Sequence, residues 1–278
     1  MNRLPIEARA KILHCLVEGN SMRATSRLCD VSINTVTKLL VEVGMACGIY
    51  QTQVLRNLPC KRVQCDEIWS FCGMKQKNTP ADQERGSEWL GDVYTFTAIC
   101  ADTKICPSFL VGQRTAEDTH EFIADLAGRL AGRIQLTTDG FQQYVDAVEV
   151  GFGANVDFAM LVKNYSNPSA QVSAERRYSP SEFMRADKRR ITGAPDLKEV
   201  STSYVERQNL TMRMGMRRFT RLTNGFSKKI KNLECAVALH FMYYNFGRIH
   251  KTLRVTPAME AGISDHVWTL EEIAALAD

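Results

Sequence analysis

Apolar positions in the first 48 residues recur every three to four residues, which is the spacing of amphipathic helices. The first stripe spans 6–17 and is followed by Gly19-Asn20, which stops a helix. The same pattern predicts a short helix over 22–29 and another over 33–43, ended by Gly44. Serine is a favoured N-cap residue, and it precedes the second and third helices as Ser21 and Ser32.

Two short helices joined by a three-residue turn are typical of a helix-turn-helix, whose second helix enters the major groove of DNA. Small polar and basic side chains on that helix can reach base edges or phosphates. The candidates on the outward face of the third helix are Asn34, Thr35, Thr37 and Lys38. The alternative is a small helical bundle that packs against the rest of the chain.

From residue 61 the pattern changes to short apolar runs that indicate strands. We predict strands over 61–71, 93–100, 105–111, 134–138 and 156–162. Helices are predicted over 115–130, 141–150, 201–214 and 232–246, and from residue 269. Three consecutive strands, followed by strands that alternate with helices, predict a mixed sheet with helices on both faces. This order matches the RNase-H-like fold, in which the first and fourth strands are adjacent.

These elements predict an α/β protein with a helical N-terminal part. We assign a helix-turn-helix DNA-binding domain to 1–48 and a linker to 49–60. An RNase-H-like, integrase-type catalytic domain follows over 61–250, with a helical C-terminal part. It contains a polar insertion over 163–200, broken by prolines, and a tail occupies 251–278.

The composition excludes several classes of protein. Hydrophobic residues make up 45% and charged residues 24% of the 278 positions, which is ordinary globular usage. The sequence contains no run of about 18 apolar residues, so it predicts no membrane span. The start of the chain also lacks the apolar core of a signal peptide. Nine cysteines are irregularly spaced without a C-x-x-C pair, so we expect no zinc site and no disulfide framework. A cytoplasmic location is the expectation.

Charge is distributed unevenly along the chain. The net charge is +4, but 176–231 holds fifteen Lys or Arg and five Asp or Glu, a local net charge of +10. Such asymmetry favours a surface that binds a polyanion, and aromatic residues within the run can stack on unpaired bases. The candidate DNA contacts here include Arg217, Arg218, Arg221, Lys228 and Lys229. The alternative is a solvated basic face.

Three carboxylates stand out by their position. Asp66 lies within the first predicted strand, Asp139 directly follows the fourth, and Glu206 lies on a helix after the insertion. Adjacent first and fourth strands would bring the two aspartates together, and the helix would supply the third carboxylate. Glu67 competes with Asp66, but neighbouring strand residues face opposite sides, so we expect only one of them to face the site. Taken singly, each acid could equally be an edge, turn or surface residue.

Clustered carboxylates repel one another and resist desolvation, and hard divalent cations offset that cost. Two ions about 3.5–4 Å apart can activate an attacking oxygen and stabilise the leaving oxygen of a phosphodiester. The arrangement therefore predicts two Mg²⁺ per site, with Mn²⁺ as a substitute, bound by the same three carboxylates that would be catalytic.

Four strings, in order along nearly the whole chain, resemble bacterial DDE transposases, and the insertion-sequence-one family in particular. They are CDEIWSF (65–71), TTDG (137–140), YVERQNLTMRMGMRRFTRLTNGFSKK (204–229) and YNFGRIHKTLRVTPAMEAG (244–262). By the resemblance, Asp66, Asp139 and Glu206 are the catalytic carboxylates. Arg213 matches a basic residue that grips terminal DNA, and Asn209 is a candidate contact to DNA or to the catalytic carboxylates.

Two features depart from the family pattern. The cysteine zinc finger that often precedes the helix-turn-helix is absent from this sequence. The spacing between Asp139 and Glu206 is longer than in compact members, and the 163–200 insertion accounts for it. Glu199 and Glu182 are the alternatives for the third carboxylate.

The resemblance implies a DNA transposase that binds the terminal inverted repeats of an insertion sequence, cleaves its ends and joins them to target DNA. The partners would be double-stranded DNA and further copies of the chain, as a homodimer or higher oligomer on DNA. The location would be the bacterial cytoplasm, at the nucleoid. The alternatives are an RNase-H-like nuclease that cleaves without joining, and a catalytically inactive DNA-binding regulator.

Overall fold

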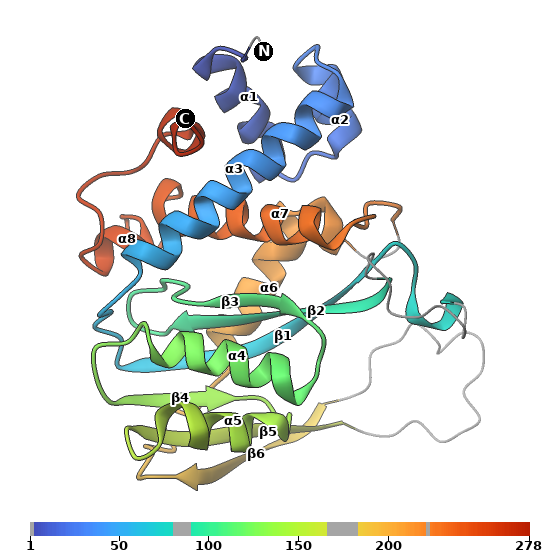
Figure 1. The fold of residues 1–278 in the computed structure, drawn as a ribbon. Coiled ribbons are helices and arrows are strands. Elements are labelled where there is room, and N and C mark those ends of the chain that lie inside the picture. Colours follow the sequence, from blue (N-terminus) through green and yellow to red (C-terminus); the bar gives the residue numbers. More distant parts are fainter. Residues whose placement is uncertain (1–2, 80–89, 166–182, 221–222) are drawn as a thin grey trace.

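A computed structural model describes residues 3–79, 90–165, 183–220 and 223–278 (Figure 1). Its centre is one six-stranded mixed sheet with the strand order β3-β2-β1-β4-β5-β6. The strands are β1 (Arg62–Cys72), β2 (Gly91–Cys100), β3 (Phe109–Gly112), β4 (Ile134–Thr138), β5 (Val156–Tyr165) and β6 (Phe183–Thr192). The first three pair antiparallel, whereas β1, β4 and β5 pair in parallel. The predicted adjacency of the first and fourth strands is confirmed.

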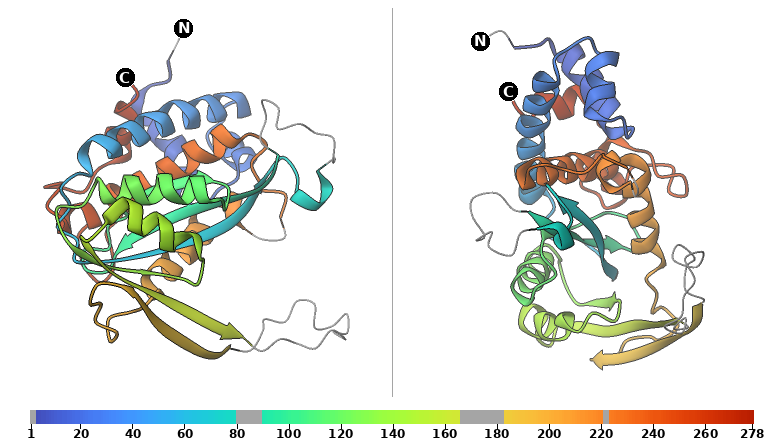
Figure 2. Two further views of the ribbon diagram at one scale, coloured as in Figure 1. Left: turned by 60° about the horizontal axis from the view of Figure 1, so that its bottom comes forward. Right: turned by 90° about the vertical axis from the view of Figure 1, so that its right-hand side faces the viewer.

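Helices cover both faces of the sheet. They are α1 (Ile6–Val17), α2 (Met22–Leu28), α3 (Ile33–Val54), α4 (Ala116–Ala127), α5 (Gln143–Phe152), α6 (Ser203–Gly215), α7 (Ile230–Met242), α8 (Pro257–Glu260) and α9 (Leu270–Ala275). The helices α4 and α5 lie on one face and α6 on the other, while α3 and α7 run side by side beyond β3 (Figure 2). The protein is thus a mixed α/β structure, as the pattern predicts.

Local capping signals predict where several helices begin. Ser21 and Ser32 accept hydrogen bonds from backbone N–H groups in the first turns of α2 and α3. Thr115 does the same for α4, and Thr269 forms a capping box with Glu272 at α9. Each cap satisfies one of the donors that a helix leaves unpaired at its N-terminus.

The predicted end of the third helix at Gly44 is wrong, because α3 continues to Val54. It therefore passes without a break through residue 48 and into the segment expected to be a linker. Gly44 serves a different purpose: a Cβ at this position would lie 2.6 Å from the Cβ of Cys235 on α7. The missing side chain lets the two helices approach closely, and the tertiary contact outweighs the intrinsic tendency of glycine to end a helix.

The N-terminal helices are tied to the C-terminal part of the chain. The Gln51 side chain on α3 donates a hydrogen bond to the Ala238 carbonyl of α7 at 3.0 Å. Arg9 on α1 binds the carboxylate of Asp278 through both terminal guanidinium nitrogens. This is the packing that the bundle alternative expects, and DNA reading by α3 stays a prediction.

The sequence pattern did not predict β6, and it predicted too great a length for the third strand. The segment 163–200, expected to be a polar insertion, contributes β6, which pairs antiparallel with β5 at the sheet edge. Most of its side chains are exposed, so it lacks the apolar alternation by which strands are predicted. The third strand is shorter than predicted and begins only at Phe109. Within the described ranges, no helix is both long and apolar enough to cross a membrane.

Candidate metal centre

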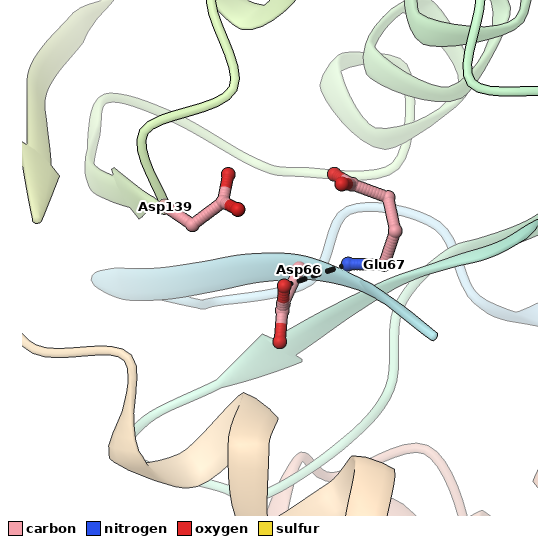
Figure 3. A group of neighbouring side chains, drawn as sticks. All are labelled: Asp66, Glu67 and Asp139. Carbon is pink, nitrogen blue, oxygen red and sulfur yellow. Dashed lines mark hydrogen bonds between the residues drawn. The ribbon is translucent and has the colours of Figure 1, made fainter. Parts of the chain in front are cut away.

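A group of three carboxylates lies where β1 and β4 meet. Cys65 of β1 is opposite Thr138 of β4, so the residues that follow them, Asp66 and Asp139, are neighbours. With Glu67 they form a group in which one oxygen from each side chain lies within 4.8 Å of the others (Figure 3). Such a set of oxygen ligands could hold a divalent cation.

Of Asp66 and Glu67, only Asp66 lines the cavity that also holds Asp139 and Glu206, as alternation along β1 predicts, but Glu67 also lies close to Asp139. The two side chains do leave β1 on opposite sides, as strand geometry requires (Figure 3). Asp139, however, follows the end of β4 rather than lying within it, so its carboxylate is close to both. Alternation therefore separates Asp66 from Glu67, but a residue beyond the end of the neighbouring strand can lie close to both.

The carboxylate of Asp66 is held by two hydrogen bonds. The backbone N–H of Glu67 donates to Oδ1 at 2.9 Å, and the side-chain amide of Asn209 on α6 donates to Oδ2 at 2.8 Å. Burial and the nearby charge of Asp139 raise the pKa of Asp66 to about 7. The hydrogen bonds therefore offset only part of the cost of ionising this side chain.

Glu67 has a cation close by. Its Oε2 accepts a hydrogen bond from Arg114 at 3.1 Å, and only 2% of its side chain is exposed. Burial and the charge of Asp139 raise the pKa of Glu67 to about 8. The same guanidinium lies 3.6 Å from Asp139 and packs over the ring of Phe141. Arg114, which the sequence interpretation did not single out, thus joins two of the three acids.

Glu206 reaches the same cavity from α6 but does not join the three-carboxylate group. The side-chain oxygen of Gln64 on β1 accepts hydrogen bonds from the first backbone N–H groups of α6 and so fixes the helix against the strand. Glu206, Asp66 and Asp139 line one cavity of about 390 Å³. Within it, Glu206 forms an ion pair with Lys163 and accepts a hydrogen bond from Thr202.

The sequence interpretation missed Lys163 and Thr202. Lys163 lies on β5, which pairs with β4, so the sheet order places it near Asp139, but no local motif marks it. Of the alternatives for the third carboxylate, Glu199 forms an ion pair with Arg62, and Glu182 lies outside the described residues.

The predicted DNA contacts occupy different environments. Asn34 and Lys38 are exposed on α3, whereas the hydroxyls of Thr35 and Thr37 bond to Ser32 and to the Ile33 carbonyl. Arg217, Lys228 and Lys229 are exposed, Arg213 is half-buried, and Arg221 lies outside the described residues.

Arg218 is engaged within the protein. Its guanidinium donates a hydrogen bond to the Ser227 hydroxyl at 2.7 Å and lies 3.8 Å from the sulfur of Met22. Burial lowers the pKa of Arg218 to about 10. The contacts tie the segment after α6 to the N-terminal helices, so this guanidinium is less accessible than its neighbours in the basic run.

No protein-family model matches the chain, and no curated protein sequence matches it. Solved structures similar to it include the Mos1 transposase paired-end complex with left transposon end, at 11% identity and a TM-score of 0.24. That match covers 57% of this chain and 60% of the Mos1 chain. The Mos1 strand transfer complex matches at 12% identity with a TM-score of 0.23, covering 57% and 59%. TM-scores this low support no statement about function, so the site geometry carries the proposal.

Proposed function

We propose that the chain is a DDE-type DNA transposase with an RNase-H-like catalytic domain. It would bind the terminal inverted repeats of an insertion sequence, cleave the DNA ends and join them to target DNA. The observation that carries the proposal is the placement of Asp66 within β1 beside Asp139, which directly follows the neighbouring parallel strand β4, with Glu206 lining the same cavity.

The donor set fits a divalent metal. All the ligand atoms offered are carboxylate oxygens, which Mg²⁺ and Mn²⁺ prefer. The raised pKa values of Asp66 and Glu67 show that burial and mutual repulsion leave the negative charge of the group poorly compensated. A bound cation would offset this repulsion.

Asp66, Asp139 and Glu206 are the residues that would hold two Mg²⁺ or Mn²⁺. Bound there, the ions would supply an activated attacking oxygen and would stabilise the leaving oxygen of a phosphodiester. The chain's own contribution is positioning: Asn209 orients the Asp66 carboxylate, and the backbone N–H of Phe141 orients that of Asp139 at 2.9 Å. Lys163 balances the charge of Glu206 from the opposite wall.

The basic segment and the N-terminal helices supply the DNA contacts in this proposal. The segment 176–231 carries a net charge of +10, and it includes α6, which contributes Glu206. The first turns of α3 would read the terminal repeats through Asn34 and Lys38. Because two DNA ends must be paired for strand transfer, the proposal includes a dimer or higher oligomer on DNA.

The test is an assay of cleavage and joining on labelled DNA that carries the ends of the element, with a plasmid target and Mg²⁺ or Mn²⁺. Replacing Asp139 by Asn removes a ligand charge, and we expect activity to fall about 1000-fold, which corresponds to about 4 kcal/mol. Asp146→Asn is the matched control, since that carboxylate is 75% exposed on α5.

Three further variants decide the third carboxylate. Glu206→Gln should abolish both steps, whereas Glu199→Gln should leave them unchanged, and Glu67→Gln tests whether the third acid comes from β1 instead. Cleavage without joining would favour a nuclease of the same fold. DNA binding without either reaction would favour the regulator and contradict the proposal.

A further inference from the structure

A second cavity, of about 200 Å³, lies along another face of α6. Its walls come from α6, from the turn after β2 and from the segment that follows the π-helical turn Tyr243–Gly247. The lining is cationic, and its charged members are Lys104, Arg207, Arg248 and Lys251. Arg207 belongs to the basic run 176–231, but none of the four is among the individual residues that the sequence analysis names as DNA contacts.

The positive charge in this cavity has no counter-charge among the residues that the structure describes. Within the described ranges, no Asp or Glu lines the cavity or forms an ion pair with any of these four side chains. Lys104 lies 3.6 Å from the ring centroid of Tyr204, which also lines the cavity. Like charges gathered without a counter-charge repel one another, so the cavity is suited to an anion.

One further donor or acceptor in the cavity lacks a partner. The Nδ1 atom of His250 is shielded from solvent and forms no hydrogen bond with any described residue. Its own burial and the charges of Lys104 and Arg248 lower the pKa of His250. His250 therefore lines the cavity as a neutral side chain at neutral pH and adds no further positive charge to it.

The cavity wall is built by specific contacts. The backbone N–H of His250 donates to the Val255 carbonyl at 2.9 Å, and that of Arg254 donates to the His250 carbonyl at 2.8 Å, which closes a tight turn. The Tyr244 hydroxyl donates to the Lys104 carbonyl at 2.9 Å and joins this segment to the turn after β2. Hydrogen bonds therefore hold the backbone segments that carry these cationic side chains.

The helix α6 lines both this cavity and the acidic one, with different side chains. Glu206 lines the acidic cavity and the next residue, Arg207, lines the cationic one. Leu210 and Met214, exposed by 43% and 72%, lie on the helix surface between these two directions. A helix with side chains is about 10 Å across, so DNA that reaches both cavities would place phosphates of nearby nucleotides at them.

We propose that the cationic cavity binds a backbone phosphate of the DNA strand whose cleavage occurs at the acidic site, within a few nucleotides of the reacting bond. This inference rests on the proposed function, because it takes DNA as the substrate. The occupant is a phosphodiester rather than a free phosphate, because the cavity adjoins the helix that carries Glu206.

The test measures binding of end DNA in EDTA, where no cleavage occurs. Arg248→Gln and Lys251→Gln each remove one lining charge, and Arg254→Gln is the matched control, since it is exposed in the same turn but does not line the cavity. We expect each cavity variant to bind about 10-fold more weakly and the slope of log K against log salt to become shallower by about 0.9. Arg254→Gln should behave as the wild type.

A scan with single uncharged methylphosphonate linkages locates the phosphate. In the wild type, a methylphosphonate at one or two positions near the cleavage site should weaken binding. In Arg248→Gln the same substitution should cost clearly less than in the wild type, because part of the interaction with that phosphate has already been removed. An unchanged affinity and salt slope in both cavity variants, or a methylphosphonate penalty as large in them as in the wild type, overturns the inference.

Separate outcomes distinguish this inference from the proposed function. If Mg²⁺ supports cleavage but the cavity variants bind DNA normally, only the cavity inference fails. If binding depends on the cavity but no metal supports cleavage, only the proposed function fails. A titration with inorganic phosphate, followed through the NMR signals of His250, tests whether the occupant of the cavity is free phosphate instead of DNA. A shift there without any effect on DNA binding would assign the cavity to free phosphate and overturn the inference.

Discussion

Replacing Asp66 by Asn should stabilise the metal-free protein at neutral and alkaline pH. The pKa of this carboxyl is raised from 3.8 to about 7 in the folded chain, mainly by burial and by Asp139. Between these values the unfolded chain has released the proton and the folded chain has kept it. The contribution of this carboxyl to the free energy of unfolding therefore falls by about 1.4 kcal/mol per pH unit over that interval and is flat on either side. The total reaches about 4 kcal/mol.

The measurement is urea unfolding in EDTA from pH 4 to pH 8.5, for the wild type and for Asp66→Asn. The variant cannot ionise at this position, so its advantage should grow from pH 4 to pH 7 and then stay constant. Asp146→Asn gives the reference for removing one surface carboxylate. At pH 8, Mg²⁺ should stabilise the wild type more than Asp66→Asn, because a cation that binds only the folded state adds its binding free energy. A difference that stays constant from pH 4 to pH 8 would refute the reasoning.

Three further variants, one of them a control, test the packing and the site. Gly44→Ala should destabilise the protein by about 1–3 kcal/mol in thermal or urea unfolding, because the new Cβ would overlap Cys235. Gly48→Ala on the same helix is the control, because a Cβ there would have its nearest neighbour, the Cβ of Ala238, at 3.8 Å. It should be neutral or stabilising by up to about 1 kcal/mol. Equal effects of the two substitutions on stability would contradict the close approach of the helices at Gly44. Asn209→Leu removes the amide that holds Asp66 and should lower metal-dependent cleavage about 10–100-fold with the fold retained by circular dichroism. Unchanged cleavage would show that this hydrogen bond does not position the carboxylate.

The local sequence determined the helix starts and the order of the strands. Serine and threonine caps mark helices because their effect depends on backbone groups only a few residues away, as at Ser32 and Thr269. The apolar runs of β1 and β4 predict two buried strands, and the order of strands and helices predicts that they are adjacent. Together these signals bring Asp66 and Asp139 to one place before any coordinates are known.

The tertiary structure decided what lies around those two aspartates. Glu67 joins the acidic group because Asp139 follows the end of its strand, and Lys163 pairs with Glu206 because β5 lies beside β4. Gly44 reads locally as a helix end, but its role depends on a helix almost two hundred residues further along the chain. In each case the deciding neighbour is remote in sequence, and local patterns carry no information about side chains that meet only when the chain has folded.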